Sequence, residues 1–189
     1  MTRFGNPEMP IGAYNLIPSL AHQLISRQPR SVLDLGIGFG NHGAMVRQWL
    51  DLGVTPFKTT LVGVEAWTNY RSPLWSLYDI VYSMRIEEYL TSTEDLFDCI
   101  LLCDVIEHFE KADGVGLLRA VANRVATGGC LIVGTPASFF EQGAVYGNEL
   151  ERHRSLWSEE DFQRLGFEVE IVGRASDFGG ESIHATWMP

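Results

Sequence analysis

The stretch that decides the fold is Val32-Leu33-Asp34-Leu35-Gly36-Ile37-Gly38-Phe39-Gly40. It begins as a short apolar strand that carries one carboxylate, Asp34, and then places a glycine at every second position. Glycine lets the backbone adopt positive φ or approach a ligand where a Cβ would collide. Apolar residues at helical spacing follow between Ala44 and Leu50. A strand, a glycine turn and a helix in this order predict a nucleotide-sized pocket at the carboxyl edge of a parallel sheet.

The rest of the chain supports such a sheet, because short apolar segments alternate with helical patterns. The predicted strands are 31–35, 60–65, 80–82, 97–103, 130–134, 167–171 and 183–188. Helices are predicted over 20–26, 41–52, 74–78, 85–90, 115–125 and 158–166. This alternation predicts an α/β fold with a doubly wound, mostly parallel sheet. The last two strands lack a helix between them, so the seventh strand should be antiparallel.

The bulk composition is typical of one globular domain. The chain has 189 residues, of which 46% are hydrophobic and 20% are charged. A formal net charge of -10 argues against nucleic acid as the main partner, because Lys and Arg supply phosphate binding. No run of about 18 apolar residues is present, so no membrane span is expected. No secretion signal is visible either, which favours the cytoplasm.

The cysteines point to the same compartment. Cys99, Cys103 and Cys130 all lie in apolar, strand-like segments. An odd number without C-x-x-C pairs argues against a disulfide framework or a zinc site. Buried, reduced thiols are therefore expected.

Four residues of the opening stretch, Asp34, Gly36, Gly38 and Gly40, match the pattern D-x-G-x-G-x-G. The chain therefore resembles the class I S-adenosylmethionine-dependent methyltransferases, in particular their type 11 small-molecule subgroup. The resemblance implies the Rossmann-like methyltransferase fold, with seven strands and the last one reversed. It also implies S-adenosylmethionine as the cofactor and an enzyme that transfers its methyl group.

The resemblance covers residues 19–189, which form the predicted cofactor-binding domain. Residues 1–18 are irregular in sequence and are predicted to be a terminal segment or lid. Tyr14, in that segment, is a candidate cover for the carboxylate of the cofactor. The oligomeric state has no signal in the sequence.

Two other functions compete with methyl transfer. Gly38-Phe39-Gly40-Asn41-His42-Gly43 also fits G-x-G-x-x-G, the fingerprint of dinucleotide sites. That fingerprint wants an acid about 20 residues on, and the next suitable acid, Glu65, comes later. The alternative is an NAD-dependent oxidoreductase. A second alternative is a cofactor-binding partner subunit without catalytic activity.

Further cofactor contacts are predicted at the ends of three strands. Glu65 closes the second strand, and an ionised carboxylate accepts hydrogen bonds from a diol, as in the ribose of the resembled family. Ala66 follows it as part of an adenine wall. Ser83 and Met84 stand where that family often places an Asp near the adenine amino group. Asp104 opens a D-x-x-E-H segment of the type 11 pattern and would face the methionine half of the cofactor.

Two histidines are the candidate catalytic residues. His108 ends the D-x-x-E-H segment, and His153 precedes the aromatic residue and helix cap of the type 11 pattern. An imidazole titrates near neutral pH, so either can act as the base for an acceptor that carries its proton into the reaction. Asp104, Glu107 and His108 could also bind a metal, but no further spaced ligand supports that, so no metal is expected.

The predicted reaction is an in-line transfer of methyl to an O, N or C nucleophile of a small molecule. A loop of about 20 residues after the fifth strand is long enough to be functional. Its aromatic residues either line an acceptor pocket or fix the loop to the core; they are Phe139, Phe140, Tyr146 and Trp157.

Overall fold

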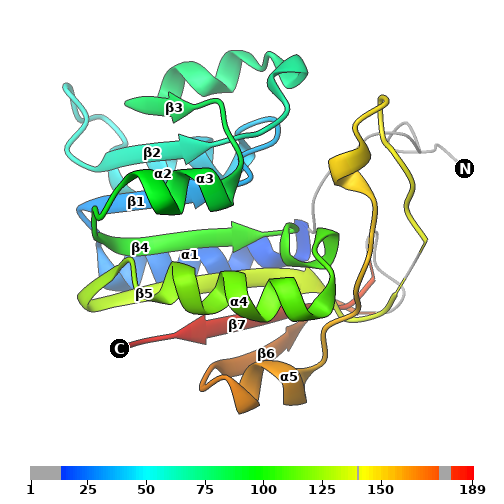
Figure 1. Cartoon of the computed structure of the whole chain (residues 1–189). Coiled ribbons are helices and arrows are strands. Elements are labelled where there is room, and N and C mark those ends of the chain that lie inside the picture. The colour runs from blue at the N-terminus through cyan, green and yellow to red at the C-terminus, as the bar shows by residue number, and fades with distance from the viewer. Residues whose placement is uncertain (1–13, 140, 175–179) are drawn as a thin grey trace, which may run out of the picture.

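A computed structural model describes residues 14–139, 141–174 and 180–189 of the chain. One seven-stranded sheet runs through this part, in the order β3-β2-β1-β4-β5-β7-β6 (Figure 1). The strands are β1 (Ser31–Leu35), β2 (Thr60–Val64), β3 (Ile80–Tyr82), β4 (Phe97–Cys103), β5 (Val125–Pro136), β6 (Glu168–Val172) and β7 (Ser182–Trp187). The predicted fold class, the Rossmann-like methyltransferase fold, is confirmed.

The direction of the last strand follows from the length of its connection. β1 to β5 pair in parallel, whereas β7 lies between β5 and β6 and is antiparallel to both. Only the residues between Val172 and Ser182 join β6 to β7, and a parallel pair needs a crossover of a dozen residues or more.

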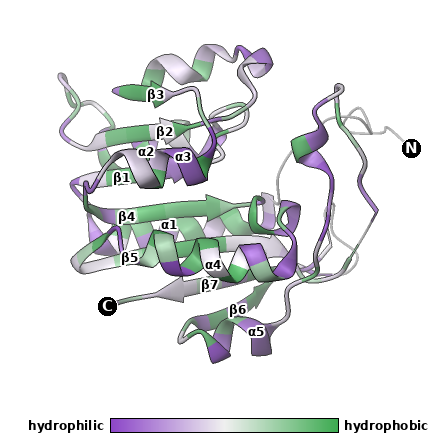
Figure 2. Ribbon diagram, in the orientation of Figure 1, coloured by the Kyte–Doolittle hydropathy of each residue, from purple (hydrophilic) through white to green (hydrophobic). Residues whose placement is uncertain are grey.

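Helices cover both faces of the sheet, because alternate strand residues point to opposite faces. In β4, Leu101 packs with one apolar cluster, which holds residues of α1 and α2. Its neighbour Leu102 packs with the other cluster, which holds residues of α3, α4 and α5. The helices are α1 (Ile17–Arg27), α2 (Asn41–Leu50), α3 (Ile86–Ser92), α4 (Lys111–Ala122) and α5 (Glu159–Arg164). Figure 2 shows hydrophobic residues along the central strands and hydrophilic ones on the outer helices.

The helices and strands differ from the prediction in where they begin, most clearly for β5 and α1. β5 begins at Val125 rather than at residue 130, because Val125 already pairs with Phe97 of β4. α1 begins at Ile17, and a 3-10 turn over Tyr14–Leu16 precedes it. Residues 1–13 of the predicted N-terminal segment lie outside the described residues.

All three cysteines are buried and free, as expected from their apolar surroundings. In the described ranges, no helix combines the length and apolar character needed to cross a membrane.

The carboxyl ends of the parallel strands meet at one edge of the sheet. The long segment between β5 and α5 passes over that edge (Figure 1, yellow to orange). The described residues also include four more 3-10 turns: η2 (Thr68–Tyr70), η3 (Pro73–Leu77), η4 (Ile106–His108) and η5 (Glu149–Glu151). The strand order reverses between β1 and β4, and ligands of open α/β sheets bind at such a switch point.

Candidate active site

A cavity of about 860 Å³ opens at this edge of the sheet. Its walls come from the glycine turn after β1, the ends of β2 and β4, η4, and the segment between residues 142 and 154. The volume lies within the range of roughly 300–1,000 Å³ that is usual for small-molecule sites.

The glycine turn forms one wall. Gly36 and Gly38 line the cavity and have φ angles of 76° and 50°. A Cβ on Gly36 would stand 2.5 Å from Val105 Cγ2, whereas a Cβ on Gly38 would meet nothing within 4 Å. The backbone at Gly38 is thus open to a ligand. Trp75 fixes the turn by donating from Nε1 to the carbonyl of Gly38 at 2.8 Å. Gly40 precedes α2 with a φ of 86° and is not among the cavity-lining residues.

Glu65 stands beside this turn at the rim of the cavity. Its side chain is only 7% exposed. Oε2 accepts a hydrogen bond from the Gly38 N–H at 2.9 Å, and Oε1 accepts one from the Trp67 N–H at 2.7 Å. Burial raises the pKa of Glu65, and these two hydrogen bonds oppose that rise. Each oxygen keeps acceptor capacity for a ligand, because a carboxylate oxygen has more than one lone pair. Ala66, the next residue, also lines the cavity.

Asp34 lies behind the turn rather than on the cavity wall. It is 1% exposed, and its Oδ2 accepts a hydrogen bond from the Tyr78 hydroxyl at 2.6 Å. The same hydroxyl accepts from the Gly43 N–H at 3.1 Å. Oδ1 of Asp34 is buried and has no hydrogen-bond partner among the described residues. Burial raises the pKa of this carboxyl.

Tyr78 is therefore a structural support of the turn that sequence reasoning missed. A Cβ added to Gly43 would stand 2.3 Å from its ring, and one added to Gly63 would stand 2.8 Å from it. Gly63 gave a signal, because a glycine inside a strand often marks the close approach of another group.

The residues that line the cavity after β3 are not the ones predicted from the sequence. Ser83 is exposed, and Met84 packs partly buried against the core beneath α3. Neither is among the lining residues; Arg85, Ile86 and Glu87 line the cavity at this point. The chain reaches the cavity as it enters α3.

Asp104 turns the chain sharply at the end of β4. It lines the cavity and has a φ of 55°, which is uncommon for a residue other than glycine. Its N–H donates to the carbonyl of Gly134 at 2.8 Å, so this conformation is held by β5. Backbone strain of this kind tends to occur at functional sites. The turn leads directly into η4, which carries Glu107 and His108.

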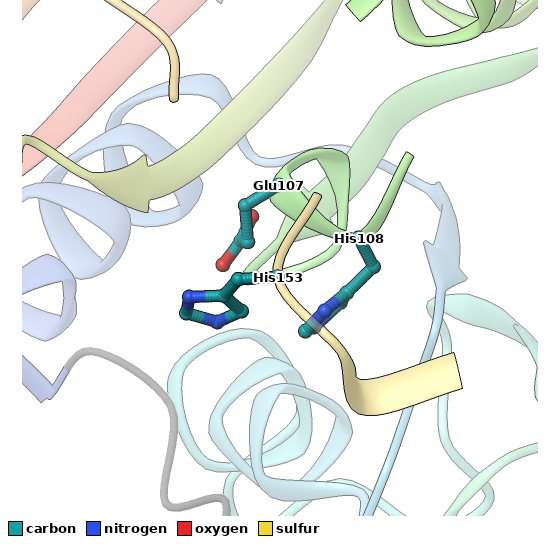
Figure 3. A group of neighbouring side chains, drawn as sticks. All are labelled: Glu107, His108 and His153. Atoms are coloured by element: carbon teal, nitrogen blue, oxygen red, sulfur yellow. The ribbon is translucent and has the colours of Figure 1, made fainter. Parts of the chain in front are cut away.

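Glu107, His108 and His153 come together at this end of the cavity. One potential ligand atom from each lies within 4.8 Å of the others. The two imidazole rings have centroids 5.1 Å apart and are inclined by 51°. Figure 3 shows the three side chains pointing toward one another, with the Glu107 carboxylate directed at His153. Sequence reasoning singled out all three residues but left Glu107 and His153 unconnected.

Glu107 is a buried carboxylate, 3% exposed. Its Oε2 accepts from the Thr135 hydroxyl at 3.0 Å. Burial and the neighbouring charge of Asp104 raise the pKa of Glu107 well above its usual range. Burial lowers the pKa of His108, which favours a neutral imidazole at neutral pH.

Backbone contacts fasten the His153 segment to η4. The N–H groups of Arg154 and Ser155 donate to the carbonyl of Glu107 at 2.8 and 3.1 Å. Arg154 also donates from Nη1 to the carbonyl of His108 at 2.9 Å. These bonds fix His153 opposite His108.

A further contact within the cavity wall joins two segments far apart in the chain. The Tyr70 hydroxyl donates to the carboxylate of Glu151, and both residues line the cavity. Tyr14 lines it as well. Tyr70 and Glu151 carried no sequence signal, because they lie in two short 3-10 turns far apart in the chain.

The aromatic residues of the long segment divide between core and surface. Trp157 is 1% exposed and packs against Phe162 with ring centroids 5.2 Å apart, so it fixes the segment to the core. Phe139 and Tyr146 are exposed and are not among the lining residues. Phe140 lies outside the described residues.

Fold and cavity together define a doubly wound α/β protein with a cavity of small-molecule size at its switch point. A family model described as a methyltransferase domain matches residues 13–170. The chain therefore belongs to the methyltransferase-domain family, and the predicted resemblance to class I methyltransferases is confirmed. This assignment decides against the nicotinamide-dependent oxidoreductase that the glycine pattern also allowed.

Solved structures share the fold at low sequence identity. A Burkholderia thailandensis 1,6-didemethyltoxoflavin-N1-methyltransferase, with bound 1,6-didemethyltoxoflavin and S-adenosylhomocysteine, is 17% identical with a TM-score of 0.66. The match covers 92% of this chain and 77% of that one. The N-methyltransferase NodS from Bradyrhizobium japonicum is 18% identical, with a TM-score of 0.58 and coverage of 92% and 96%.

An O-methyltransferase family protein from Burkholderia thailandensis is 13% identical, with a TM-score of 0.62. The match covers 92% of this chain, which spans only 55% of that protein. No curated protein sequence matches.

Proposed function

We propose that this protein transfers a methyl group from S-adenosylmethionine to an O, N or C nucleophile of a small molecule. The observation that carries the proposal is that one cavity joins the glycine turn and Glu65 at one end to His108 and His153 at the other. A cofactor held at the first end would present its methyl group toward the second.

The residues at the first end fit the nucleoside part of the cofactor. Gly38 leaves open the space that a Cβ would occupy, so a ligand can lie against the backbone. Glu65 is fixed by two backbone N–H groups and can still accept hydrogen bonds from the two ribose hydroxyls. Asp34 acts indirectly, since its carboxylate holds Tyr78 under the turn. Ala66 contributes to the adenine wall, and Asp104 stands toward the methionine half.

When bound, S-adenosylmethionine supplies an activated sulfonium methyl group, so alignment is the main task of the protein. Holding the nucleophile in line with the methyl carbon and sulfur removes much of the entropic barrier. His108 and His153 face the acceptor and can take its proton where the acceptor carries one. Ser83 and Met84 stay candidates for adenine contacts, with Arg85, Ile86 and Glu87 nearer to the cavity.

Neighbouring structures support this assignment of ligands. The 1,6-didemethyltoxoflavin-N1-methyltransferase holds S-adenosylhomocysteine and 1,6-didemethyltoxoflavin within a similar fold. The net charge of -10 argues against nucleic acid as the acceptor, and the free buried cysteines suit the cytoplasm.

Calorimetric titration with S-adenosylhomocysteine and with NAD tests the proposal. S-Adenosylhomocysteine should bind in the micromolar range or tighter, at about -8 kcal/mol, and NAD should not bind. Replacing Glu65 by Ala should weaken binding of S-adenosylhomocysteine by about 1–3 kcal/mol, because ribose donors lose a buried acceptor. Glu168→Ala, an exposed acid at the start of β6 that is not among the cavity-lining residues, is the control and should leave affinity unchanged. Unchanged affinity in Glu65→Ala contradicts the ribose assignment.

A further inference from the structure

The cluster at the acceptor end has the composition of a metal site. Glu107, His108 and His153 offer one carboxylate oxygen and two imidazole nitrogens within 4.8 Å of one another. Two ligands on one ion, each at about 2.0–2.1 Å, stand roughly 3.4 Å apart in a tetrahedral site. The widest pair therefore has to close by about 1.4 Å, which side-chain rotation can provide.

The second observation is that the Glu107 carboxyl group is buried, with only 3% of the residue exposed. Among the described residues, no lysine or arginine forms an ion pair with it. The backbone N–H of Arg154 donates to the carbonyl of Glu107. The guanidinium of Arg154, however, donates to the carbonyls of His108, Arg152 and Glu149. A carboxyl group buried in this way is held neutral by a proton, and a bound metal ion takes the place of that proton. The Thr135 hydroxyl donates to this carboxylate at 3.0 Å.

We propose that Glu107, His108 and His153 bind one divalent transition-metal ion, of which Zn²⁺ is the reference, beside the methyl-transfer position. Two imidazoles select zinc or iron over magnesium or calcium, which prefer all-oxygen sites. Three protein ligands leave a coordination position open, as in catalytic zinc sites. That position faces the cavity, which all three residues line.

The ion gives the acceptor end a specific chemistry, and this step rests on the proposed function. The ion binds the hydroxyl oxygen of the acceptor and lowers the pKa of that hydroxyl, whose proton passes to water. The oxygen lone pair then forms the bond to the methyl carbon while the carbon–sulfur bond breaks and its electron pair stays on sulfur. The two histidines are ligands in this arrangement rather than bases. The structure thus favours an acceptor with an ionisable hydroxyl.

Metal titration tests the site directly. Protein freed of metal by a chelator is titrated with ZnCl₂ by calorimetry. Wild type should bind one equivalent, and Glu107→Gln and His153→Ala should each bind it at least roughly tenfold more weakly. His22→Ala, an exposed histidine on α1, is the matched control and should bind as wild type does. If wild type binds Zn²⁺ no more tightly than His153→Ala, the site is disproved.

Binding of S-adenosylhomocysteine separates this proposal from the proposed function. His153→Ala should bind it within about twofold of wild type, which also shows that the variant is folded. Zinc binding without any binding of S-adenosylhomocysteine overturns the proposed function and leaves the metal site standing. The opposite pattern overturns the metal site alone.

Acetohydroxamate, a small oxygen chelator, probes the open position. It should bind the zinc-loaded wild type and show no binding to the zinc-free protein or to His153→Ala after the same zinc treatment. Equal binding with and without zinc, or none to the loaded protein, contradicts an open position in the cavity.

Discussion

The two ends of the cavity are built in different ways. The end proposed for the cofactor, here called the cofactor end, comes from the turn after β1 and the end of β2, and its key contact joins Gly38 to Glu65 across neighbouring parallel strands. The end proposed for the acceptor, here called the acceptor end, joins η4 to a segment 44 residues further along the chain, where His108 contacts Arg152. One end is set by local backbone conformation, and the other by how a long connection packs. Changes at the two ends should therefore differ in what they disturb.

The largest loss of stability is expected from removing Trp157, which fixes the long segment between β5 and α5 to the core. Trp157→Ala should lower the free energy of unfolding by about 3–5 kcal/mol, because a fully buried aromatic side chain is removed. Chemical denaturation measures the loss. Phe139→Ala, exposed in the same segment, should change stability by less than about 0.5 kcal/mol. Equal effects of the two substitutions would show that Trp157 does not anchor the segment. Trp157→Phe provides a milder variant if the alanine protein does not fold.

The cofactor end should lose binding rather than folding. Gly38→Val should weaken binding of S-adenosylhomocysteine at least roughly 100-fold, or about 2.7 kcal/mol, because its side chain enters the cavity. Gly53→Val is a matched control, since Gly53 also has a positive φ of 74° and open space around it, but lies outside the cavity. Both variants should lose about 1–2 kcal/mol of stability from the positive φ. Normal binding by Gly38→Val contradicts contact between turn and ligand.

The support beneath the turn should have an intermediate effect. Tyr78→Phe removes the donor to Asp34 and the acceptor for the Gly43 N–H, and should cost about 1–3 kcal/mol of stability. Affinity for S-adenosylhomocysteine should fall with it, because the turn loses its support. Thermal unfolding and calorimetry measure the two losses. Tyr89→Phe, at a buried position of α3 that is not among the cavity-lining residues, is the control and should leave affinity unchanged. An equal loss of affinity in the two variants would show that Tyr78 has no specific role in supporting the turn.

The smallest effect is a pH dependence of binding at the cofactor end. Burial raises the pKa of Glu65 above its usual value of 4.5. As pH falls through that raised pKa, the carboxylate takes up a proton and loses acceptor capacity for the ribose. The affinity for S-adenosylhomocysteine should therefore fall as the pH is lowered from neutral through that raised pKa, by at most about tenfold per pH unit for one proton. Glu65→Gln should abolish this slope, and an equal slope in both proteins would rule out Glu65 as its source.

Much of the cofactor end was predictable from the sequence. The pattern from Asp34 to Gly40 placed the turn, and Glu65 followed from its position at the end of an apolar strand. The glycines of the turn and Glu65 come from short segments with strong backbone preferences, so the sequence marks them directly. Tyr78 was not predicted, since the contact of its hydroxyl with Asp34 spans 44 residues and depends on how η3 packs.

The acceptor end was only partly predictable. His108 and His153 were predicted separately, each from its own motif. A metal was not expected, because the sequence showed no further ligand at a suitable spacing. The packing of Trp157 and the bonds from Arg154 and Ser155 to Glu107 bring His153 to Glu107 and His108. Such contacts join segments with no periodic pattern, and sequence patterns carry no information on them.

The sequence by itself determined the doubly wound sheet, its reversed last strand and the position of the glycine turn. Each depends on hydrophobic periodicity, connection length or the conformational freedom of glycine, which are properties of neighbouring residues. Only the tertiary structure decided that Asp34 lies behind the turn and that a buried carboxylate meets two imidazoles across the cavity. Those outcomes depend on which distant side chains the packing of the core brings within a few ångströms of one another.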